Sequence, residues 1–427
     1  MSRILVVGSG GREHAILRAL SRSSSRPELL CAPGNAGTGQ IAENVSVATD
    51  DIDGLVQLAA ERSVDLVVVG PEVPLVLGLA DRLEESGIAV VGPSASAARL
   101  EGSKAFAKNF MERHGIPTAR SRTFSKDQLE EATAYTLNHA LPVVIKADGL
   151  AAGKGVLVAE TRGEIVEGLQ SMFDGAFGAA GDEVVVEEFM QGEEASVFVL
   201  TDGTDYVLLS LAQDHKRIGE GDTGLNTGGM GSYAPAPVVT DDILVTVESQ
   251  IVRPVLRGMA SEGNPYSGVL YVGLMITDGG PKVVEFNCRF GDPETQVVLP
   301  LLESDVVGVF EAIVYGRVGQ LDLQFRLGSA ACVVLASAGY PGAYEKGKVI
   351  SGLEQAEEIA TVFHAGTADV EGTIVTNGGR VLGVTGYGKD LESALAVAYR
   401  ACDLISFEGK TYRRDIGRKG LAHLSEP

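Results

Sequence analysis

The segment from Val283 to Glu294 places side chains suited to metal and phosphate chemistry on one short stretch of chain. In an extended strand alternate side chains share a face, so Glu285, Asn287 and Arg289 point to the same side. A carboxylate and a carboxamide are hard oxygen ligands that suit Mg²⁺, and a guanidinium can neutralise charge on a transferring phosphoryl group. The segment therefore predicts metal-assisted phosphoryl chemistry. The alternative, a surface strand with a polar outer face, is disfavoured because the intervening residues are apolar and aromatic.

A second segment, 143–155, carries a lysine inside an apolar strand. Alternation places Lys146 and Asp148 on one face. A lysine in such a strand requires an anionic partner, and the small residues that follow can close over phosphates with backbone N–H groups. Because the pattern G-x-x-x-x-G-K-[ST] is absent, the segment is not a Walker loop.

Two acids, Glu187 and Glu188, stand where an apolar strand leaves its predicted sheet, and Glu194 follows. A backbone edge with an apolar side chain at that point can hold an adenine ring, and Glu194 can accept hydrogen bonds from ribose hydroxyls. The alternative is a pair of exposed carboxylates before a turn. The sequence does not decide which of the two acids faces adenine.

Three glycine-containing loops, 8–14, 33–38 and 70–74, each follow an apolar run. Loops at the carboxyl ends of parallel strands gather at one edge of the sheet, and helix N-termini there bind anions. We expect these loops to hold a phosphosugar-like ligand rather than to be plain turns. Glu13 occupies the third glycine position of G-x-G-x-x-G, which disfavours a dinucleotide site.

The charged run 213–217 includes Asp214 and Lys216 and is followed by a glycine-rich segment, 219–232. We expect that segment to form neither helix nor strand, because glycine is conformationally permissive. A permissive loop beside Lys, Arg and His side chains is suited to clamp a phosphate or a carboxylate.

The elements that must position these residues follow from the apolar pattern. Continuous apolar runs at 4–8, 29–32, 66–70 and 89–92 alternate with helical patterns at 13–20, 51–62 and 75–86, which predicts a doubly wound parallel sheet. A smaller α+β unit follows, and the last hundred residues, from about Gly328, form a small α/β cap. The expected fold class is therefore α/β and α+β in several domains.

Length and charge restrict the function further. A chain of 427 residues is expected to form two to four domains. Its net charge of −22 disfavours nucleic-acid polymers and anionic membranes as partners. No apolar run approaches the roughly 18 residues of a membrane span, and the four cysteines show no C-x-x-C pair. We expect a cytoplasmic, monomeric enzyme with free thiols and small-molecule substrates.

Taken together, the segments 145–149, 187–188 and 285–289 resemble the ATP-grasp superfamily. Within it, the segments 10–15, 32–38, 213–217, 226–231 and 285–294 resemble the phosphoribosylamine–glycine ligase family, also called glycinamide ribonucleotide synthetases. The similarity continues in order through 363–367 and 377–381, so it covers essentially the whole chain.

The resemblance implies a fold and a reaction. The implied reaction is the second step of de novo purine synthesis: ATP phosphorylates the glycine carboxylate, and the amine of 5-phosphoribosylamine attacks the glycyl phosphate. The implied cofactors are ATP and Mg²⁺, with Mn²⁺ as an alternative metal. The implied fold is ATP-grasp, with a substrate domain at 1–103, an ATP-grasp region at 104–327 that includes a lid subdomain at about 118–192, and a C-terminal domain at 328–427.

The same resemblance implies roles for individual positions. The positions that contact ATP are Lys104, Lys146, Gly153, Glu187, Glu188, Met190 and Glu194. The metal ligands are Glu285 and Asn287, and the groups near the reacting atoms are Arg289, Asp214 and Lys146. The positions that hold phosphoribosylamine and glycine are Gly10, Gly11, Arg12, Glu13, Asn35, Gly37, Thr38, Asp214, Lys216, Asn226, Thr227, Gly228, Arg289, Gly291 and Asp292.

The sequence departs from the wider superfamily at 271–275, where many ATP-grasp enzymes carry another acidic metal ligand. Three rival functions remain to be compared with this ligase. One is another ATP-grasp carboxylate–amine ligase, or a carboxylase, that acts on a different acid. The second is a nucleotide-binding regulator without catalysis, and the third is a dinucleotide oxidoreductase. The transfer apparatus of Lys146, Glu285 and Arg289 argues against a regulator, and Glu13 argues against an oxidoreductase.

Overall fold

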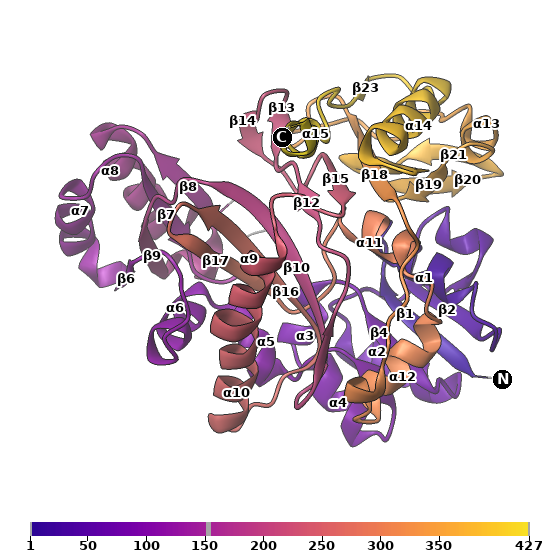
Figure 1. Ribbon diagram of the computed structural model, residues 1–427, viewed down its shortest axis with the longest axis horizontal. Helices are drawn as coiled ribbons and strands as arrows, with labels where there is room; N and C mark the ends of the chain where they lie inside the picture. The colour runs from indigo at the N-terminus through magenta and orange to yellow at the C-terminus, as the bar shows by residue number, and fades with distance from the viewer. Residues whose placement is uncertain (1, 151–154, 426–427) are drawn as a thin grey trace.

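A five-stranded parallel sheet forms the N-terminal region of the computed structural model, which describes residues 2–150 and 155–425 (Figure 1). Its strand order is β3-β2-β1-β4-β5, with every pair parallel. The strands are β1 (Arg3–Gly8), β2 (Glu28–Pro33), β3 (Glu43–Asn44), β4 (Leu66–Val69) and β5 (Ala89–Val91). The central strand β1 is fully buried at 4–7 because helices cover both faces of the sheet. The predicted doubly wound arrangement is confirmed.

Of the three helices predicted in this region, the first two are confirmed, while the helix at 95–102 was not predicted. The helices are α1 (Gly11–Leu20), α2 (Ile52–Glu61), α3 (Glu72–Val76), α4 (Leu79–Glu85) and α5 (Ala95–Gly102). The Asp51 side chain caps α2 by accepting from the Gly54 N–H at 2.9 Å. The single helix predicted at 75–86 is wrong, because Gly78 adopts a left-handed conformation with φ of 88° and separates α3 from α4.

Two antiparallel sheets build the middle of the chain. The smaller sheet has the order β6-β9-β7-β8 and the larger one β11-β10-β16-β17. The strands of the smaller sheet are β6 (Ser121–Ser125), β7 (Val143–Ala147), β8 (Val156–Ala159) and β9 (Glu183–Glu188). Those of the larger sheet are β10 (Glu193–Asp202), β11 (Tyr206–Leu208), β16 (Ser267–Thr277) and β17 (Gly280–Asn287).

The smaller sheet has its own hydrophobic core, which it forms with α7 (Leu129–Leu137) and α8 (Arg162–Ser171). In Figure 1 this unit stands apart at the left. The larger sheet instead shares a continuous core with the N-terminal sheet, α6 (Lys104–Arg113) and α10 (Arg253–Ser261). Polar contacts join the smaller unit to the rest of the protein, and several of them involve predicted site residues such as Lys104 and Lys146.

The third sheet combines strands from two separate parts of the chain. Its order is β12-β15-β18-β22-β19, and β23 (Lys410–Thr411) pairs with β18. The strands are β12 (Gln213–Asp214), β15 (Gly231–Ala234), β18 (Ser329–Ser337), β19 (Thr361–His364) and β22 (Arg380–Gly388). The strands β12 and β15 precede the predicted boundary at 328, so the C-terminal sheet extends into the middle region. The helix α14 (Leu391–Leu404) covers this sheet.

The glycine-rich segment 219–232 is not irregular, so that prediction is wrong. It contains most of a hairpin of β13 (Arg217–Gly219) and β14 (Thr223–Asn226). The hairpin is ordered by the C-terminal domain: Arg413, only 2% exposed, donates to the Arg217 carbonyl at 2.9 Å and to the Asp222 carboxylate at 2.8 Å. Such tertiary contacts override the weak strand propensity of glycine.

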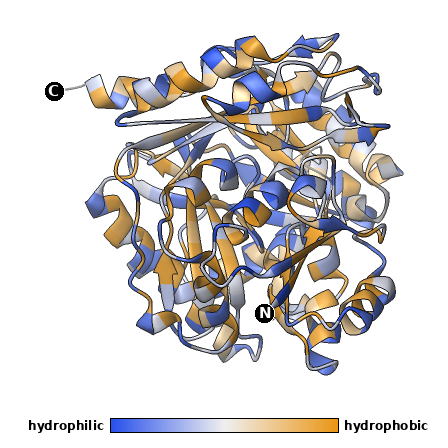
Figure 2. Ribbon diagram, turned by 90° about the vertical axis from the view of Figure 1, so that its right-hand side faces the viewer, coloured by the Kyte–Doolittle hydropathy of each residue, from blue (hydrophilic) through white to orange (hydrophobic). Residues whose placement is uncertain are grey.

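Hydrophobic residues line the strands of the interior sheets, while polar residues gather in loops and on outer helix faces (Figure 2). The four cysteines are buried and unpaired. Within residues 2–150 and 155–425, no helix has the length and apolar character needed to cross a membrane.

Candidate active site

Lys146 and Glu285 belong to different sheets and come together where β7 approaches β17. The Lys146 Nζ donates to the carbonyl oxygen of Val284, the neighbour of Glu285, at 3.3 Å. Lys104, the first residue of α6, donates to the Gly149 carbonyl at 2.7 Å, just beyond the end of β7. Two lysines predicted at ATP phosphates and one predicted metal ligand therefore lie at one junction between the two sheets.

Glu187 lies inside the protein between two lysines. Its carboxylate is 3.0 Å from the Lys146 Nζ and 3.2 Å from the Lys108 Nζ, and its side chain is 3% exposed. Burial lowers the pKa of Lys108 to about 8, although Glu187 opposes that shift. Glu187 is thus the counter-ion of a buried lysine pair, a role that the sequence interpretation did not assign to it.

Glu188 is the outward-facing neighbour. It pairs with Arg120 at 3.2 Å and with Lys282 at 3.5 Å. Met190 is half-buried in the short connection between β9 and β10. The adenine contacts of Glu187, Glu188 and Met190 stay predictions, and Gly153, predicted at the phosphates, lies outside the described residues.

Lys216 joins two of the predicted acids. Its Nζ is 2.6 Å from Glu194 on β10 and 3.6 Å from Glu285 on β17. The surrounding protein would by itself raise the pKa of Glu285, but Lys216, Lys146 and Lys104 outweigh this effect and lower that pKa to about 2. Because its side chain is also 43% exposed, Glu285 is an accessible carboxylate that is ionised at neutral pH.

Asp214 lies at the end of β12, among other carboxylates. Burial, reinforced by Glu294, Glu194 and Glu285, raises the pKa of Asp214 to about 8, although Lys216 opposes the shift. Asp214 therefore changes protonation state close to neutral pH. That is the property expected of a group that accepts a proton during a reaction.

Arg289 is held by groups from two domains. Its Nε donates to Glu72 at 3.2 Å, and its Nη2 donates to Glu101 at 2.9 Å and to the Asn287 Oδ1 at 3.0 Å. Its Nη1 donates to the Phe290 carbonyl at 3.1 Å. Sequence reasoning placed Arg289 and Asn287 on one face but missed Glu101, since nothing in the sequence of α5 marks one acid as buried.

Glu13 fills the space between two of the N-terminal loops. Its carboxylate accepts from the Gly10 N–H and from the Arg12 Nε, each at 2.6 Å. A Cβ atom at Gly8 would lie 2.4 Å from the Glu13 side chain, and one at Gly70 would lie 2.0 Å from it. Glu13, which occupies the third glycine position of G-x-G-x-x-G, thus packs between the two loops and orients Arg12.

Asn35 and Thr38 use their side chains to build their own loop. The Asn35 Oδ1 accepts from the Gly37 N–H at 2.8 Å and the Thr38 N–H at 3.0 Å. The Asn35 Nδ2 donates to the Ser9 carbonyl at 2.8 Å and the His364 carbonyl at 2.9 Å. This occupies the full usual hydrogen-bonding capacity of the amide, so in this structure Asn35 positions the loop and links it to the C-terminal domain.

The loop after β14 folds back onto Lys216, which lies in the short connection between β12 and β13. Both the backbone N–H and the Oγ1 of Thr227 donate to the Lys216 carbonyl at 2.8 Å. Asn226 ends β14, in register with Arg217, and the Gly228 N–H donates to the Tyr340 hydroxyl at 3.1 Å.

Arg380 ties this loop to the segment that follows Arg289. Its Nη2 donates to the Asp292 carboxylate at 3.0 Å, and its Nη1 donates to the Asp292 carbonyl at 2.8 Å and to the Gly228 carbonyl. Gly291 is confined as well, because a Cβ there would lie 2.4 Å from the Glu294 carboxylate. Sequence reasoning noted the motif at 377–381 but assigned no role to Arg380.

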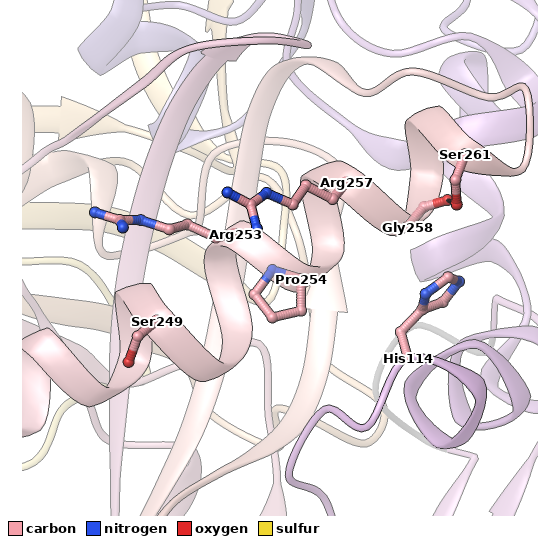
Figure 3. Close-up of a pocket in the computed structure, with 7 residues that line it drawn as sticks. All are labelled: His114, Ser249, Arg253, Pro254, Arg257, Gly258 and Ser261. Atoms are coloured by element: carbon pink, nitrogen blue, oxygen red, sulfur yellow. Dashed lines mark hydrogen bonds between the residues drawn. The ribbon is translucent and has the colours of Figure 1, made fainter.

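A separate surface hollow lies on the outer side of α10, next to the end of α6 (Figure 3). It is lined by His114, Ser249, Arg253, Pro254, Arg257, Gly258 and Ser261. None of these residues was predicted in the site. The predicted residues Lys104, Lys146, Asp214, Lys216 and Glu285 instead lie around the junction of β7, β17 and β12.

Comparison with known proteins gives a consistent result. Residues 2–101, 102–295 and 330–419 match the N domain, the ATP-grasp (A) domain and the C domain of phosphoribosylglycinamide synthetase. The chain is 52% identical over 425 residues to phosphoribosylamine–glycine ligase of Chlorobaculum tepidum, covering 98% of this chain and 100% of that protein.

Two solved structures show the same fold. The crystal structure of phosphoribosylamine–glycine ligase from Thermotoga maritima matches with a TM-score of 0.84 and 38% identity, over 97% of this chain and 100% of that one. The biotin carboxylase domain of the Hydrogenobacter thermophilus 2-oxoglutarate carboxylase matches with a TM-score of 0.73 over 96% of this chain and 92% of that one. At 18% identity the second match shows the fold alone.

Proposed function

Because the chain belongs to the phosphoribosylglycinamide synthetase family, we propose that it joins glycine to 5-phosphoribosylamine at the expense of ATP. The products are glycinamide ribonucleotide, ADP and phosphate, and the pathway is de novo purine biosynthesis. The observation that carries the proposal is the meeting of Lys146 with the Val284–Glu285 segment, which brings cationic groups and a metal-binding carboxylate to one junction.

The first step transfers the γ-phosphoryl group of ATP to glycine. A glycine carboxylate oxygen forms a bond to the γ-phosphorus, the bond from that phosphorus to the β,γ-bridging oxygen breaks, and ADP leaves. In this proposal Lys104 and Lys146 hold the phosphates, and Arg289 neutralises charge on the transferring group. Such a step needs charge neutralisation and alignment rather than a protein nucleophile.

The second step forms the amide bond. The amine nitrogen of phosphoribosylamine attacks the glycyl carbonyl carbon, phosphate leaves, and the nitrogen loses a proton. Asp214 is a suitable acceptor for this proton because its pKa of about 8 lies near neutral pH. The N-terminus of α1 and Arg12 are suited to the phosphate of phosphoribosylamine, since free N–H groups and a guanidinium favour an anion.

Glu285 and Asn287 fit a Mg²⁺ or Mn²⁺ ion. Glu285 is ionised and 43% exposed, and the Asn287 side chain adds an amide oxygen. Gly273 lies opposite Glu285 in the β16–β17 register and brings no second acid. An ion here would take its remaining ligands from nucleotide phosphates and water, as Mg²⁺ commonly does, and would neutralise charge on those phosphates.

We keep the domain division at 1–103, 104–327 and 328–427 as part of this proposal, with the lid at about 118–192. The separate core of the smaller sheet supports treating the lid as a unit. The boundary at 328 does not separate the sheets completely, because the strands β12 and β15, which precede it, belong to the C-terminal sheet and carry Asp214 and its neighbours into it.

An ADP-release assay tests the proposal and its nearest rival, another ATP-grasp carboxylate–amine ligase. The purified chain is supplied with ATP, Mg²⁺, glycine and freshly generated phosphoribosylamine, and each substrate is omitted in turn. We expect release that requires both glycine and phosphoribosylamine. Release with other amino acids but not with glycine would favour the rival ligase, and release with no acid or amine would exclude both.

A further inference from the structure

The guanidinium of Arg289 is bound by two carboxylates from the N-terminal domain. Glu72 is the first residue of α3, in the loop after β4, and Glu101 lies in the last turn of α5. Their carboxylates are 3.2 Å from the Arg289 Nε and 2.9 Å from its Nη2. Arg289 follows β17 of the larger sheet, so this bridge crosses from one domain to another.

The position of Glu101 is unfavourable for a carboxylate unless it has strong partners. The C-terminal end of a helix carries a partial negative charge, and the Glu101 side chain is only 7% exposed. Two contacts oppose this effect: Arg289 at 2.9 Å, and the Cys288 N–H, which donates to Glu101 at 2.7 Å. Burial nevertheless keeps the pKa of Glu101 above its ordinary value. Through these two contacts Glu101 fixes two successive residues directly after the predicted metal ligand Asn287.

The contacts of Arg289 leave little of its donor capacity unused. An arginine has five N–H groups, and those of Arg289 meet Glu72, Glu101, Asn287 and Phe290. Among the described residues, these four bonds leave one Nη1 N–H to meet a substrate. Glu72 and Glu101 hold the guanidinium plane of Arg289 and thereby set the direction of this remaining N–H.

The same bridge reaches the loop proposed for phosphoribosylamine. The Nη1 of Arg12 donates to the Phe290 carbonyl at 3.0 Å, and the Nη1 of Arg289 donates to the same oxygen at 3.1 Å. Two guanidinium groups from the two halves of the site thus share one acceptor. Glu13, Glu72 and Glu101 supply the negative charge that keeps them together.

We propose that Glu101, assisted by Glu72, is a positioning residue for Arg289. It holds the guanidinium in a fixed place relative to the phosphoribosylamine loops, so that the transferring phosphoryl group and the amine acceptor are aligned. This inference rests on the ligase function proposed above and adds two residues to it.

The experiment compares Glu101→Gln and Glu72→Gln with a matched control, Glu262→Gln. Glu262 also binds an arginine, Arg113, through its carboxylate, with contacts of 2.9–3.1 Å. It contacts His114 as well, at 2.8 Å, and both partners lie at the end of α6 that is distant from Lys104. In the ADP-release assay we expect Glu101→Gln to lower kcat about tenfold or more, with the KM for ATP changed less than about threefold. Glu262→Gln should keep wild-type values.

A double-mutant comparison separates positioning from general stability. If Glu101 acts through Arg289, then adding Glu101→Gln to Arg289→Lys should change kcat by less than about twofold. A Glu101→Gln variant with wild-type kcat, or effects that multiply in the double variant, would overturn the inference. If Glu101→Gln does not fold, Glu72→Gln is judged by the same criteria, because the Glu72 side chain is more exposed, at 25% against 7% for Glu101.

A second measurement does not depend on activity. In a crystal structure of Glu101→Gln we expect Arg289 to lose its 3.0 Å bond to Asn287, and a retained bond would contradict the inference. If the wild-type chain released no ADP with glycine and phosphoribosylamine, the proposed function would fail, while this structural result would still decide whether Glu101 positions Arg289.

Discussion

Replacing Glu187 by Gln tests whether a buried carboxylate holds the lid against the rest of the site. The change preserves the shape of the side chain but removes the charge shared by Lys146 and Lys108, at 3.0 Å and 3.2 Å. All three side chains are less than 10% exposed, so water cannot replace the lost partner. We therefore expect a large loss in stability of the smaller sheet.

The size of this loss in stability depends on how Lys146 and Lys108 respond when residue 187 no longer carries a charge. Removing one partner of a buried ion pair costs about 3–5 kcal/mol. A buried lysine that has lost its partner can release its proton, and the free energy of that release sets an upper limit on the cost. For a lysine with the ordinary pKa of about 10.4, the release costs about 1.4 kcal/mol for each unit by which the pH lies below the pKa. That limit is about 5 kcal/mol at pH 7 and about 2 kcal/mol at pH 9. Lys108, with its pKa already at about 8, adds only about 1 kcal/mol at pH 7.

Amide hydrogen exchange of peptides covering β7 and β9 measures this loss. We expect the opening free energy to fall by about 3–5 kcal/mol at pH 7 and by no more than about 2 kcal/mol at pH 9. Glu262→Gln removes a surface pair and should cost no more than about 1 kcal/mol without affecting these peptides. A loss below about 1 kcal/mol at pH 7 for Glu187→Gln would refute the counter-ion role.

Two further predictions concern carboxylates of the site. The folded-state pKa of Asp214, about 8, lies above its ordinary value of 3.8, so the folded state binds more protons between these values and stability falls as pH rises through this window. Asp214→Asn should therefore raise the thermal midpoint relative to wild type more at pH 9 than at pH 5, and an equal effect at both pH values would contradict the shift. Glu285→Ala should lower kcat about 100-fold or more with the circular dichroism spectrum unchanged, because the metal ligand is lost; a near-wild-type rate would remove Glu285 from the site.

The sequence allowed the parts of the site that lie on single elements to be predicted. The apolar runs of β1, β2, β4 and β5 predicted buried parallel strands, because both faces of such a sheet are covered. Alternation along β17 likewise predicted that Glu285 and Asn287 share a face, and in the structure the residue between them, Phe286, lies in the core. These inferences depend only on strand geometry and burial.

Contacts between distant segments could not be predicted in the same way. The pairing of Glu187 with Lys108 was not predicted, because the sequence does not show that Lys108 of α6 packs against β9. Glu101 contacts Arg289 from the last turn of α5, and Arg380 contacts Asp292 from the C-terminal sheet. Nothing in the sequence around either residue indicates these contacts. The β13–β14 hairpin was missed because its order depends on Arg413, nearly 200 positions away.

The central claim is that the Lys146 and Glu285 segments hold the phosphate tail of one nucleotide. Anomalous diffraction from crystals grown with Mn²⁺ and a non-hydrolysable ATP analogue tests it directly. We predict a single manganese-rich site about 2.0–2.3 Å from a Glu285 carboxylate oxygen, with the terminal phosphate within about 3 Å of the Lys146 Nζ. Manganese and phosphates bound elsewhere, with Lys146 still paired only to Glu187 and Val284, would contradict it.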